Sequence, residues 1–152
     1  MKARLVAVCG LILLLSGCGR PPEVDIEFQK FATVSYFADG TRLVVNSNLF
    51  FESDRTTLRP EAVKVLRSLY RQVQEQNFTK IEILAHCDNA LTEESAHVVT
   101  AYQAEMVAGY FWFRGISSAQ IEFTGLGYSN PIAALDNAQG IYTNQRIEVR
   151  LS

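Results

Sequence analysis

Cysteine is scarce in this sequence, and its placement limits the covalent chemistry of the chain. The three cysteines stand at positions 9, 18 and 87. Cys9 lies within an N-terminal apolar run that we expect to be removed, and Cys18 directly follows that run. Only Cys87 then stays available inside the mature chain, so we expect no internal disulfide.

The sequence also lacks an apolar run long enough for a transmembrane helix, which needs about 20 residues. Its longest run covers residues 5–15, follows Lys2 and Arg4, and precedes the small residues Ser16 and Gly17. A basic start, a short apolar centre and small residues at the end are typical of a secretory signal peptide. We predict that residues 1–17 are a signal peptide and take no part in the fold.

The junction after this segment, Leu-Ser-Gly-Cys at residues 15–18, resembles the bacterial lipoprotein lipobox. The resemblance implies that Cys18 carries a covalent diacylglycerol and an acyl chain, with residues 18–23 as a lipidated linker. No other cofactor is expected. Gly19, in place of the aspartate that retains lipoproteins in the inner membrane, favours the outer membrane. The alternative is an ordinary signal peptide followed by an incidental cysteine.

The mature chain has no excess of basic residues. Removal of Lys2 and Arg4 from the 14 basic residues leaves 12 against 16 acidic residues, a net charge of about −4. This balance argues against a nucleic-acid partner and against electrostatic adhesion to anionic lipid.

Hydrophobic periodicity predicts alternating strands and helices. Alternation predicts strands at residues 24–28, 41–46, 49–51, 81–86, 121–124 and 146–151, the last of them half-exposed, while the state of residues 31–37 stays open. Helical spacing predicts one helix that opens at Pro60 and a second that runs from Thr92 or Ser95 to about Phe113, where Gly115 ends it. A short helix is possible around Gly140.

This order predicts an α+β two-layer sandwich, β-α-β-α-β-(α)-β, behind an N-terminal β-hairpin extension. Residues 24–47 form the predicted hairpin region, with a tight turn at Asp39-Gly40, and residues 48–152 form the main domain. Four consecutive aromatic residues at 110–113 cannot all face one helical stripe. We therefore expect Trp112 or Phe113 to lie outside the helical stripe, exposed or covered by a partner. Packing under the N-terminal hairpin is the preferred account of these aromatics, and an interface with a partner is the alternative.

The most informative stretch, residues 81–89, is a strand that runs into a polar tip. Leu84 breaks its alternation, so we expect both faces of this strand to be covered. Asp88 stands where the strand ends before a long helix, a position where α/β layers build binding crevices. We predict that Asp88 contacts a small polar ligand; the alternative is an Asx turn or helix cap. Cys87 is expected to be buried and unreactive, and a metal site at His86, Cys87 and Asp88 is disfavoured.

Three blocks together resemble the OmpA-like peptidoglycan-associated domain. They are residues 50–62, which match the family's first strand and helix start; residues 81–89, which match "I-x-I-x-G-H-T-D-N"; and residues 125–133 with 144–149, which match "G-x-G-x-x-x-P-I-A" and "N-R-R-V-E-I". The resemblance implies a non-catalytic domain that binds the stem peptide of peptidoglycan. No catalytic motif is legible, and Cys87 with His97 is the only pair that a hydrolase could use.

The resemblance also implies the ligand-binding residues. Asp88 matches the family aspartate that faces the ammonium of diaminopimelate, and Asn89 and Asp54 belong to the same matched motifs. The family's two arginines are missing: Gln103 stands in place of the second-helix arginine and Gln145 in place of the first arginine of "N-R-R", while Arg146 keeps the second. Arg146 has an alternative role, as partner of a carboxylate across the sheet.

Loss of a charged donor weakens a site for a zwitterion. Hydrogen bonds to charged groups contribute about 1.5–3 kcal/mol, which is roughly ten- to a hundred-fold in affinity. The predicted site is thus weakened, retuned to an amidated stem peptide, or given up. In the last case the chain would be a structural subunit that binds other envelope proteins, as small OmpA-like lipoproteins of type IVB secretion outer-membrane complexes are. The expected location is the outer membrane, lipid-anchored, with the domain in the periplasm.

Overall fold

A computed structural model describes residues 26–152, with side chains described from Phe28 onward. The predicted signal peptide, the lipidated Cys18 and the linker lie outside the described residues. Within residues 26–152, no helix is both long and apolar enough to cross a membrane.

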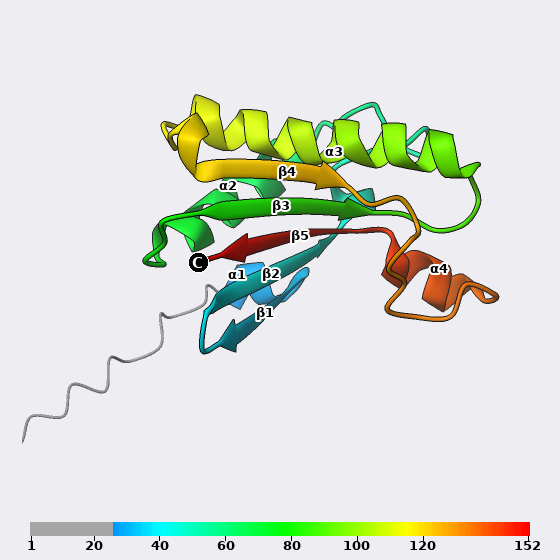
Figure 1. The fold of residues 1–152 in the computed structure, drawn as a ribbon, viewed down its shortest axis with the longest axis horizontal. Coiled ribbons are helices and arrows are strands. Elements are labelled where there is room, and N and C mark those ends of the chain that lie inside the picture. Colours follow the sequence, from blue (N-terminus) through cyan, green and yellow to red (C-terminus); the bar gives the residue numbers. More distant parts are fainter. Residues whose placement is uncertain (1–25) are drawn as a thin grey trace, which may run out of the picture.

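Five strands form one sheet in the order β1-β2-β5-β3-β4 (Figure 1). Their bounds are β1 Ala32–Phe37, β2 Gly40–Asn46, β3 Ile81–His86, β4 Ile121–Gly125 and β5 Arg146–Leu151. β3 and β4 are parallel, and all other neighbours are antiparallel. The predicted hairpin, β1–β2, is integrated into this sheet because β2 hydrogen-bonds to β5.

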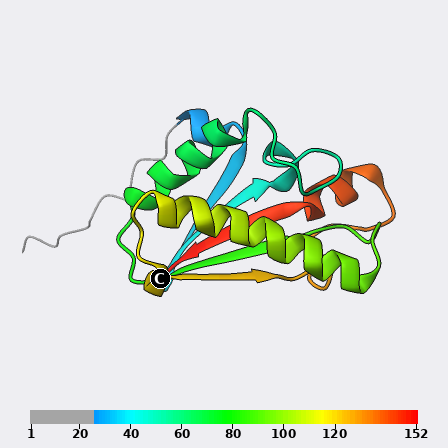
Figure 2. The ribbon, with the colours of Figure 1, turned by 90° about the horizontal axis from the view of Figure 1, so that it is seen from above.

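The long helices, α2 Ala62–Gln74 and α3 Glu93–Phe113, lie on one face of the sheet, which gives the predicted two-layer architecture (Figures 1 and 2). The other helices are α1 Ile26–Gln29 and α4 Ala138–Asn144, with short 3-10 turns at Ser47–Leu49 and Ser118–Gln120. The long α2 and α3 cover the sheet, whereas α4 lies at the end where β5 begins (Figure 1). The core between the layers is apolar and fully enclosed; it includes Leu43, Ile83, Val149, Leu69, Val107 and Phe111.

The ends of α3 are those that the sequence predicts. The Thr92 hydroxyl accepts a hydrogen bond from the Ser95 N–H at 3.3 Å and caps the first turn. At the other end Gly115 has φ +100°, and the Ile116 N–H donates to the Phe111 carbonyl at 3.1 Å. This left-handed turn suits glycine and stops the helix. Trp112 and Phe113 are 65 % and 81 % exposed, as expected for four consecutive aromatics on a helix. The predicted packing of these side chains under the hairpin is therefore wrong.

Two predicted strands are wrong. The alternation in residues 24–28 predicts an extended segment, but Ile26–Gln29 is helical, because this places Phe28 in the core and against Phe31 with ring centroids 5.3 Å apart. Residues 49–51, also predicted to be extended, lie instead at the end of a 3-10 turn, with a single bridge from Phe51 to Leu58. Phe50 and Phe51 are both buried in the same core. Successive side chains of a strand point to opposite faces, so an extended segment could not bury both of them there.

The predicted half-exposure of β5 is wrong as well. β5 lies in the centre of the sheet, and Arg146 and Glu148 on its second face are 3 % and 2 % exposed. They are buried because they pair with each other. The prediction for β3 is confirmed: Leu84 and His86 are buried on the face opposite Ile83.

Candidate functional site

Asp88 lies two residues beyond the carboxyl end of β3, where the sheet meets the start of α3. Its carboxylate is 0 % exposed and accepts hydrogen bonds from three groups of the chain. They are the Ala90 N–H at 2.7 Å, the Arg55 guanidinium at 2.9 Å, and the Gln145 side-chain amide. A buried carboxylate requires such donors, so the loop after β3 is built around this one charge.

Arg55 comes from the loop between Ser47–Leu49 and α2. One guanidinium nitrogen, Nη2, lies 2.9 Å and 3.2 Å from the two Asp88 oxygens. The Arg55 backbone has φ +66°, a left-handed conformation that is uncommon for a residue other than glycine. Asp54 stabilises the turn around it, because its carboxylate accepts the N–H groups of Thr56 and Thr57 at 3.0 Å and 2.9 Å.

Gln103 holds the same loop from the helix side. Its side chain is 2 % exposed, and its Nε2 donates to the Arg55 carbonyl at 2.8 Å. Among the described residues its Oε1 finds no hydrogen-bond donor. Gln103 is therefore linked to Asp88 through Arg55. It supplies a neutral amide at the position where the family resemblance predicts a guanidinium.

Gln145 links Asp88 to the 3-10 turn that follows β2. Its amide nitrogen donates to Asp88, and its oxygen accepts from Asn48 Nδ2. It stands between α4 and β5, next to Asn144. The buried Asn144 side chain binds the loop after β4 by accepting the N–H groups of Ile132 and Ala133 at 2.8 Å and 3.1 Å.

These contacts determine the ionisation of the site. Burial by itself raises the pKa of Asp88, but the hydrogen bonds from Gln145 and Ala90, together with Arg55, lower it below the ordinary value of 3.8. Asp88 is thus a carboxylate at neutral pH. Burial, with the neighbouring charge of Asp88, raises the pKa of Cys87 to about 11, so that thiol stays protonated.

The structure brings four of the six predicted ligand residues to one place. Asp88, Gln103, Gln145 and Asp54 surround or support the Arg55 loop, and Asn89 is exposed directly beside Asp88. Arg146 has other partners: its guanidinium donates to Glu148 at 2.9 Å and to the Asn130 carbonyl at 3.1 Å. Its role in ligand binding stays a prediction, and the contacts show a carboxylate pairing within β5 rather than across the sheet.

Arg55 is the residue that sequence reasoning missed. A cation in the loop before α2 was an available signal, but Arg59 in the same loop offers an equal one. Arg59 points elsewhere and pairs with Glu52 at 3.4 Å, with both side chains 42 % exposed. Only the folded loop distinguishes the two arginines.

A second buried polar cluster lies on the face of the sheet opposite α2 and α3. Glu148 accepts hydrogen bonds from Arg146 and, at 3.1 Å, from Arg150. Burial by itself raises the pKa of Glu148, but its contacts with Arg146 and the other neighbouring basic groups outweigh burial and lower that pKa. His86 Nε2 lies 3.5 Å from Glu148. Burial and the charge of Arg146 lower the pKa of His86 to about 4, so it is neutral at pH 7 and the contact is no ion pair.

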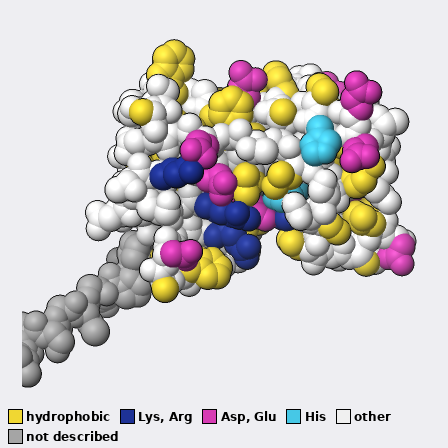
Figure 3. All heavy atoms as spheres, viewed as in Figure 1, with side chains coloured by type: hydrophobic (Ala, Val, Ile, Leu, Met, Phe, Trp, Pro, Cys, Tyr) yellow, Lys and Arg dark blue, Asp and Glu magenta, His cyan; other side chains and the backbone are white. Residues whose placement is uncertain are grey.

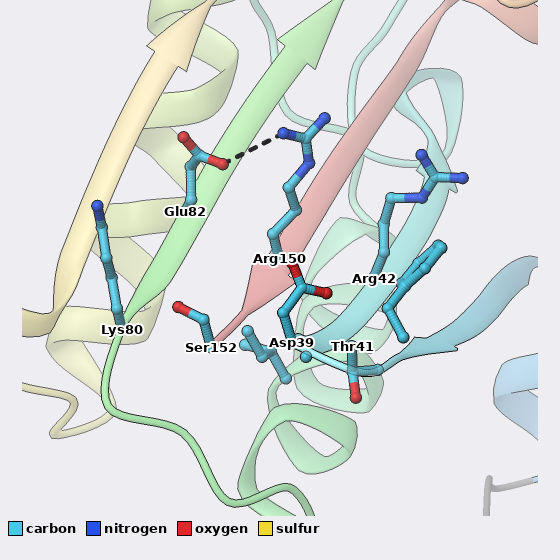
Figure 4. A pocket seen from close by; sticks show the side chains of 10 residues that line it. Asp39, Thr41, Arg42, Lys80, Glu82, Arg150 and Ser152 are labelled. Atoms are coloured by element: carbon cyan, nitrogen blue, oxygen red, sulfur yellow. Dashed lines mark hydrogen bonds and ion pairs between the residues drawn. The ribbon is translucent and has the colours of Figure 1, made fainter.

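At the end of the sheet remote from Asp88 lies a hollow whose basic side chains pair with neighbouring carboxylates. It measures about 410 Å³ and includes Arg42, Lys80, Glu82 and Arg150 (Figure 4). Arg150 pairs with Glu82 at 3.4 Å, and Lys80 pairs with Glu122 at 2.8 Å. On this face basic and acidic side chains lie side by side (Figure 3). Nowhere in residues 26–152 do three or more His, Cys, Asp or Glu side chains form a group that could hold a metal.

Comparison with known proteins identifies the relatives of this chain. It is 26 % identical to the outer-membrane lipoprotein YfiB of Pseudomonas aeruginosa over 150 residues, which covers 95 % of this chain and 89 % of YfiB. It is 26 % identical to the peptidoglycan-associated lipoprotein of the same species, over 87 % of this chain and 78 % of that protein. It is 27 % identical to the probable lipoprotein YiaD of Escherichia coli, but spans only 55 % of that protein.

Solved structures share the fold. The cell wall anchor of the T6SS from Pseudomonas aeruginosa has a TM-score of 0.75 at 17 % identity, covering 87 % of this chain and 98 % of that chain. A putative MotB-like protein from Desulfovibrio vulgaris has a TM-score of 0.74 at 23 % identity, covering 82 % of each chain. The model of the OmpA family matches residues 50–145. This range contains Arg55, Asp88, Gln103 and Gln145. The chain therefore belongs to the OmpA family.

Proposed function

We propose that this chain is an outer-membrane lipoprotein whose OmpA-like domain tethers the membrane, or an envelope complex, to peptidoglycan. The observation that carries the proposal is the fully buried carboxylate of Asp88, kept ionised at the carboxyl end of β3. An ionised carboxylate is a suitable acceptor for the ammonium group of a diaminopimelate side chain once one of the chain's own donors leaves it. The family, and relatives named as outer-membrane and peptidoglycan-associated lipoproteins, support it.

The ligand chemistry follows from the groups around Asp88. Gln103 and Gln145 can offer neutral hydrogen bonds to a carboxylate or carboxamide, and such bonds are roughly half as strong as charge-assisted ones. We therefore propose that the site favours the ammonium end of the ligand and discriminates weakly between a free and an amidated carboxyl group. Nothing in this arrangement supplies a nucleophile, so the proposed role is binding without catalysis.

The membrane anchor is proposed from the sequence. Cys18 would carry the diacylglycerol and the acyl chain, and the short segment before α1 would join lipid to domain. Radiolabelled palmitate should enter the wild-type chain and not a Cys18→Ser variant. Equal labelling of both would contradict lipidation at this residue.

The binding proposal is tested by titration of a muropeptide that contains diaminopimelate into the lipid-free Cys18→Ser chain. Saturable binding is expected, and Asp88→Ala should abolish it. Asp39→Asn is a matched control, because Asp39 is an exposed carboxylate in the hairpin turn, where Asn-Gly is as favourable as Asp-Gly. Binding that Asp39→Asn and Asp88→Ala reduce equally would contradict a site at Asp88.

A specific observation favours a second candidate, a protein-binding subunit such as one of a type IVB secretion outer-membrane complex. Trp112 and Phe123 are exposed and line a largely apolar hollow of about 230 Å³ between α3 and the edge strand β4. Exposed aromatics of this kind are common anchors of interfaces. Under this candidate, Trp112→Ala would release partner proteins captured by in-cell cross-linking while Asp88→Ala would not.

A further inference from the structure

The acceptor positions of Asp88 are already filled by the chain itself. Oδ1 accepts from the Ala90 N–H at 2.7 Å and from Arg55 Nη2 at 3.2 Å. Oδ2 accepts from the same Arg55 nitrogen at 2.9 Å and from Gln145. With the carboxylate 0 % exposed, a ligand ammonium has no free oxygen to approach. The only cation among the donors, Arg55, holds the place that the ammonium would need.

Arg55 contacts Asp88 only through its side chain. Its backbone is fixed by other contacts, the Gln103 amide on its carbonyl at 2.8 Å and the Asp54 turn on the next two N–H groups. Its side chain is 20 % exposed and so has a route to solvent. Rotation of the side chain would therefore free Asp88 without unfolding the loop.

The closed arrangement also leaves polar groups unsatisfied. Within the described part of the chain, Arg55 Nη1 is buried with no acceptor, and Gln103 Oε1 is buried with no donor. Unmade hydrogen bonds of buried groups disfavour the state that contains them. After rotation, water could hydrate the guanidinium of Arg55. An incoming ammonium brings three hydrogen-bond donors to a site in which Gln103 Oε1 lacks a donor.

We propose that Arg55 is a built-in competitor for Asp88, and that a ligand ammonium binds by displacing the Arg55 guanidinium. This inference rests on the proposed function. Only molecules with an open Asp88 bind ligand, so the measured affinity is the intrinsic affinity reduced by the open fraction. Arg55 thus sets the affinity of the site and excludes cations that bind carboxylates weakly.

The test is Arg55→Asn in the lipid-free Cys18→Ser chain, titrated with a diaminopimelate muropeptide. Asparagine removes the guanidinium but tolerates the left-handed backbone at this position. If about one molecule in ten is open in the wild type, the Kd falls about tenfold in Arg55→Asn. Arg59→Asn is the matched control, because it removes an equal charge from the same loop, 3.4 Å from Glu52 rather than from Asp88. Its Kd should stay that of the wild type.

The outcomes separate this inference from the proposed function. Binding that depends on Asp88 but is unchanged or weaker in Arg55→Asn would overturn the competitor role alone, and weaker binding would make Arg55 a ligand contact. Absence of Asp88-dependent binding in both the wild type and Arg55→Asn would overturn the proposed function and this inference together. Binding seen only in Arg55→Asn would support the competitor role of Arg55 but contradict the proposed binding of the ligand by the native chain.

A second measurement covers the case in which Arg55→Asn does not fold. The Nε–H signal of Arg55, assigned by NMR in the wild-type sequence, should shift as the muropeptide saturates the site, because the guanidinium leaves Asp88. The Arg59 signal should stay in place. Saturation that leaves the Arg55 signal unmoved would show that the ion pair persists in the complex and would overturn the displacement.

Discussion

At the scale of single residues, the buried charges of this domain are determined by their partners. Asp88 is enclosed together with Arg55, and Glu148 is enclosed together with Arg146. Burying one charge without its partner is strongly unfavourable, whereas a well-bonded pair is close to neutral in stability. Each pair therefore makes the protein sensitive to the loss of one member and to pH.

Asp88→Asn tests this at the proposed ligand site. Removal of one member of a buried pair destabilises by about 3–5 kcal/mol, and the partial exposure of Arg55 reduces this to about 2–3 kcal/mol. We expect urea unfolding at pH 7 to show that loss. Because the pKa of Asp88 is lowered in the folded state, its stabilisation is present above pH 4 and is lost as pH falls through the lowered pKa. The gap between wild type and variant should hence narrow at pH 3; an unchanged gap would contradict the ion pair.

His86 predicts a second pH dependence. Its folded pKa of about 4 lies below the ordinary 6.5, so the unfolded chain takes up a proton first as pH falls. Stability is complete above pH 6.5 and declines toward pH 4, by up to about 3 kcal/mol. His86→Asn should flatten the unfolding free energy between these pH values. Equal slopes in the wild type and His86→Asn would contradict the assignment.

Cys87 predicts a reactivity. The thiol is buried and its pKa is raised to about 11, so little thiolate exists at pH 8. In a chain with Cys9→Ser and Cys18→Ser, a thiol reagent such as DTNB should react with Cys87 only after denaturant is added. Stoichiometric reaction of the native protein within seconds would show that the loop after β3 opens readily.

At the scale of elements, α3 and β4 approach each other closely at Gly125. A Cβ atom built on Gly125 would lie 2.1 Å from the Ala101 backbone nitrogen. Relief of that clash requires the helix or the strand to move, which costs about 3 kcal/mol or more. We expect Gly125→Ala to lower the unfolding free energy by that amount in urea denaturation.

Gly109→Ala is the matched control in the same helix, since a Cβ atom added to Gly109 would meet nothing within 4 Å. Alanine is a better helix former than glycine, so this variant should gain about 0.5–1 kcal/mol. Two glycine-to-alanine changes on α3 and its partner strand would thereby move stability in opposite directions. Equal losses in both would contradict the described packing.

Sequence periodicity predicted the long helices and most strands because those elements follow one repeating pattern. It failed where the core determines the conformation locally: Phe28 and the pair Phe50–Phe51 turn the backbone so that large rings are enclosed. It also failed for Arg146 and Glu148, whose charges read as exposed until their partners are known. The contact between Arg55 and Asp88 joins residues 33 positions apart, and periodicity does not report such contacts.

At the scale of the whole molecule, the two ends of the sheet have different roles in the proposed tether. The carboxyl end of β3 leads to Asp88, and α4 lies beside it, at one end of the domain (Figure 1). The C-terminus and the β1–β2 turn lie at the opposite end, and α1, the first described element, lies nearer to that end (Figures 1 and 2). A proposed ligand site remote from α1 suits a domain that is proposed to span from a lipid anchor to the cell wall.

Ligand binding at Asp88 is tested most directly by calorimetric titration of the Cys18→Ser chain with a diaminopimelate muropeptide, in parallel with Asp88→Ala and Arg55→Asn. A site at Asp88 with Arg55 as its competitor predicts saturable binding that is lost in Asp88→Ala and tighter in Arg55→Asn, about tenfold if one molecule in ten is open in the wild type. Binding that survives Asp88→Ala, or no binding to any of the three chains, would contradict it.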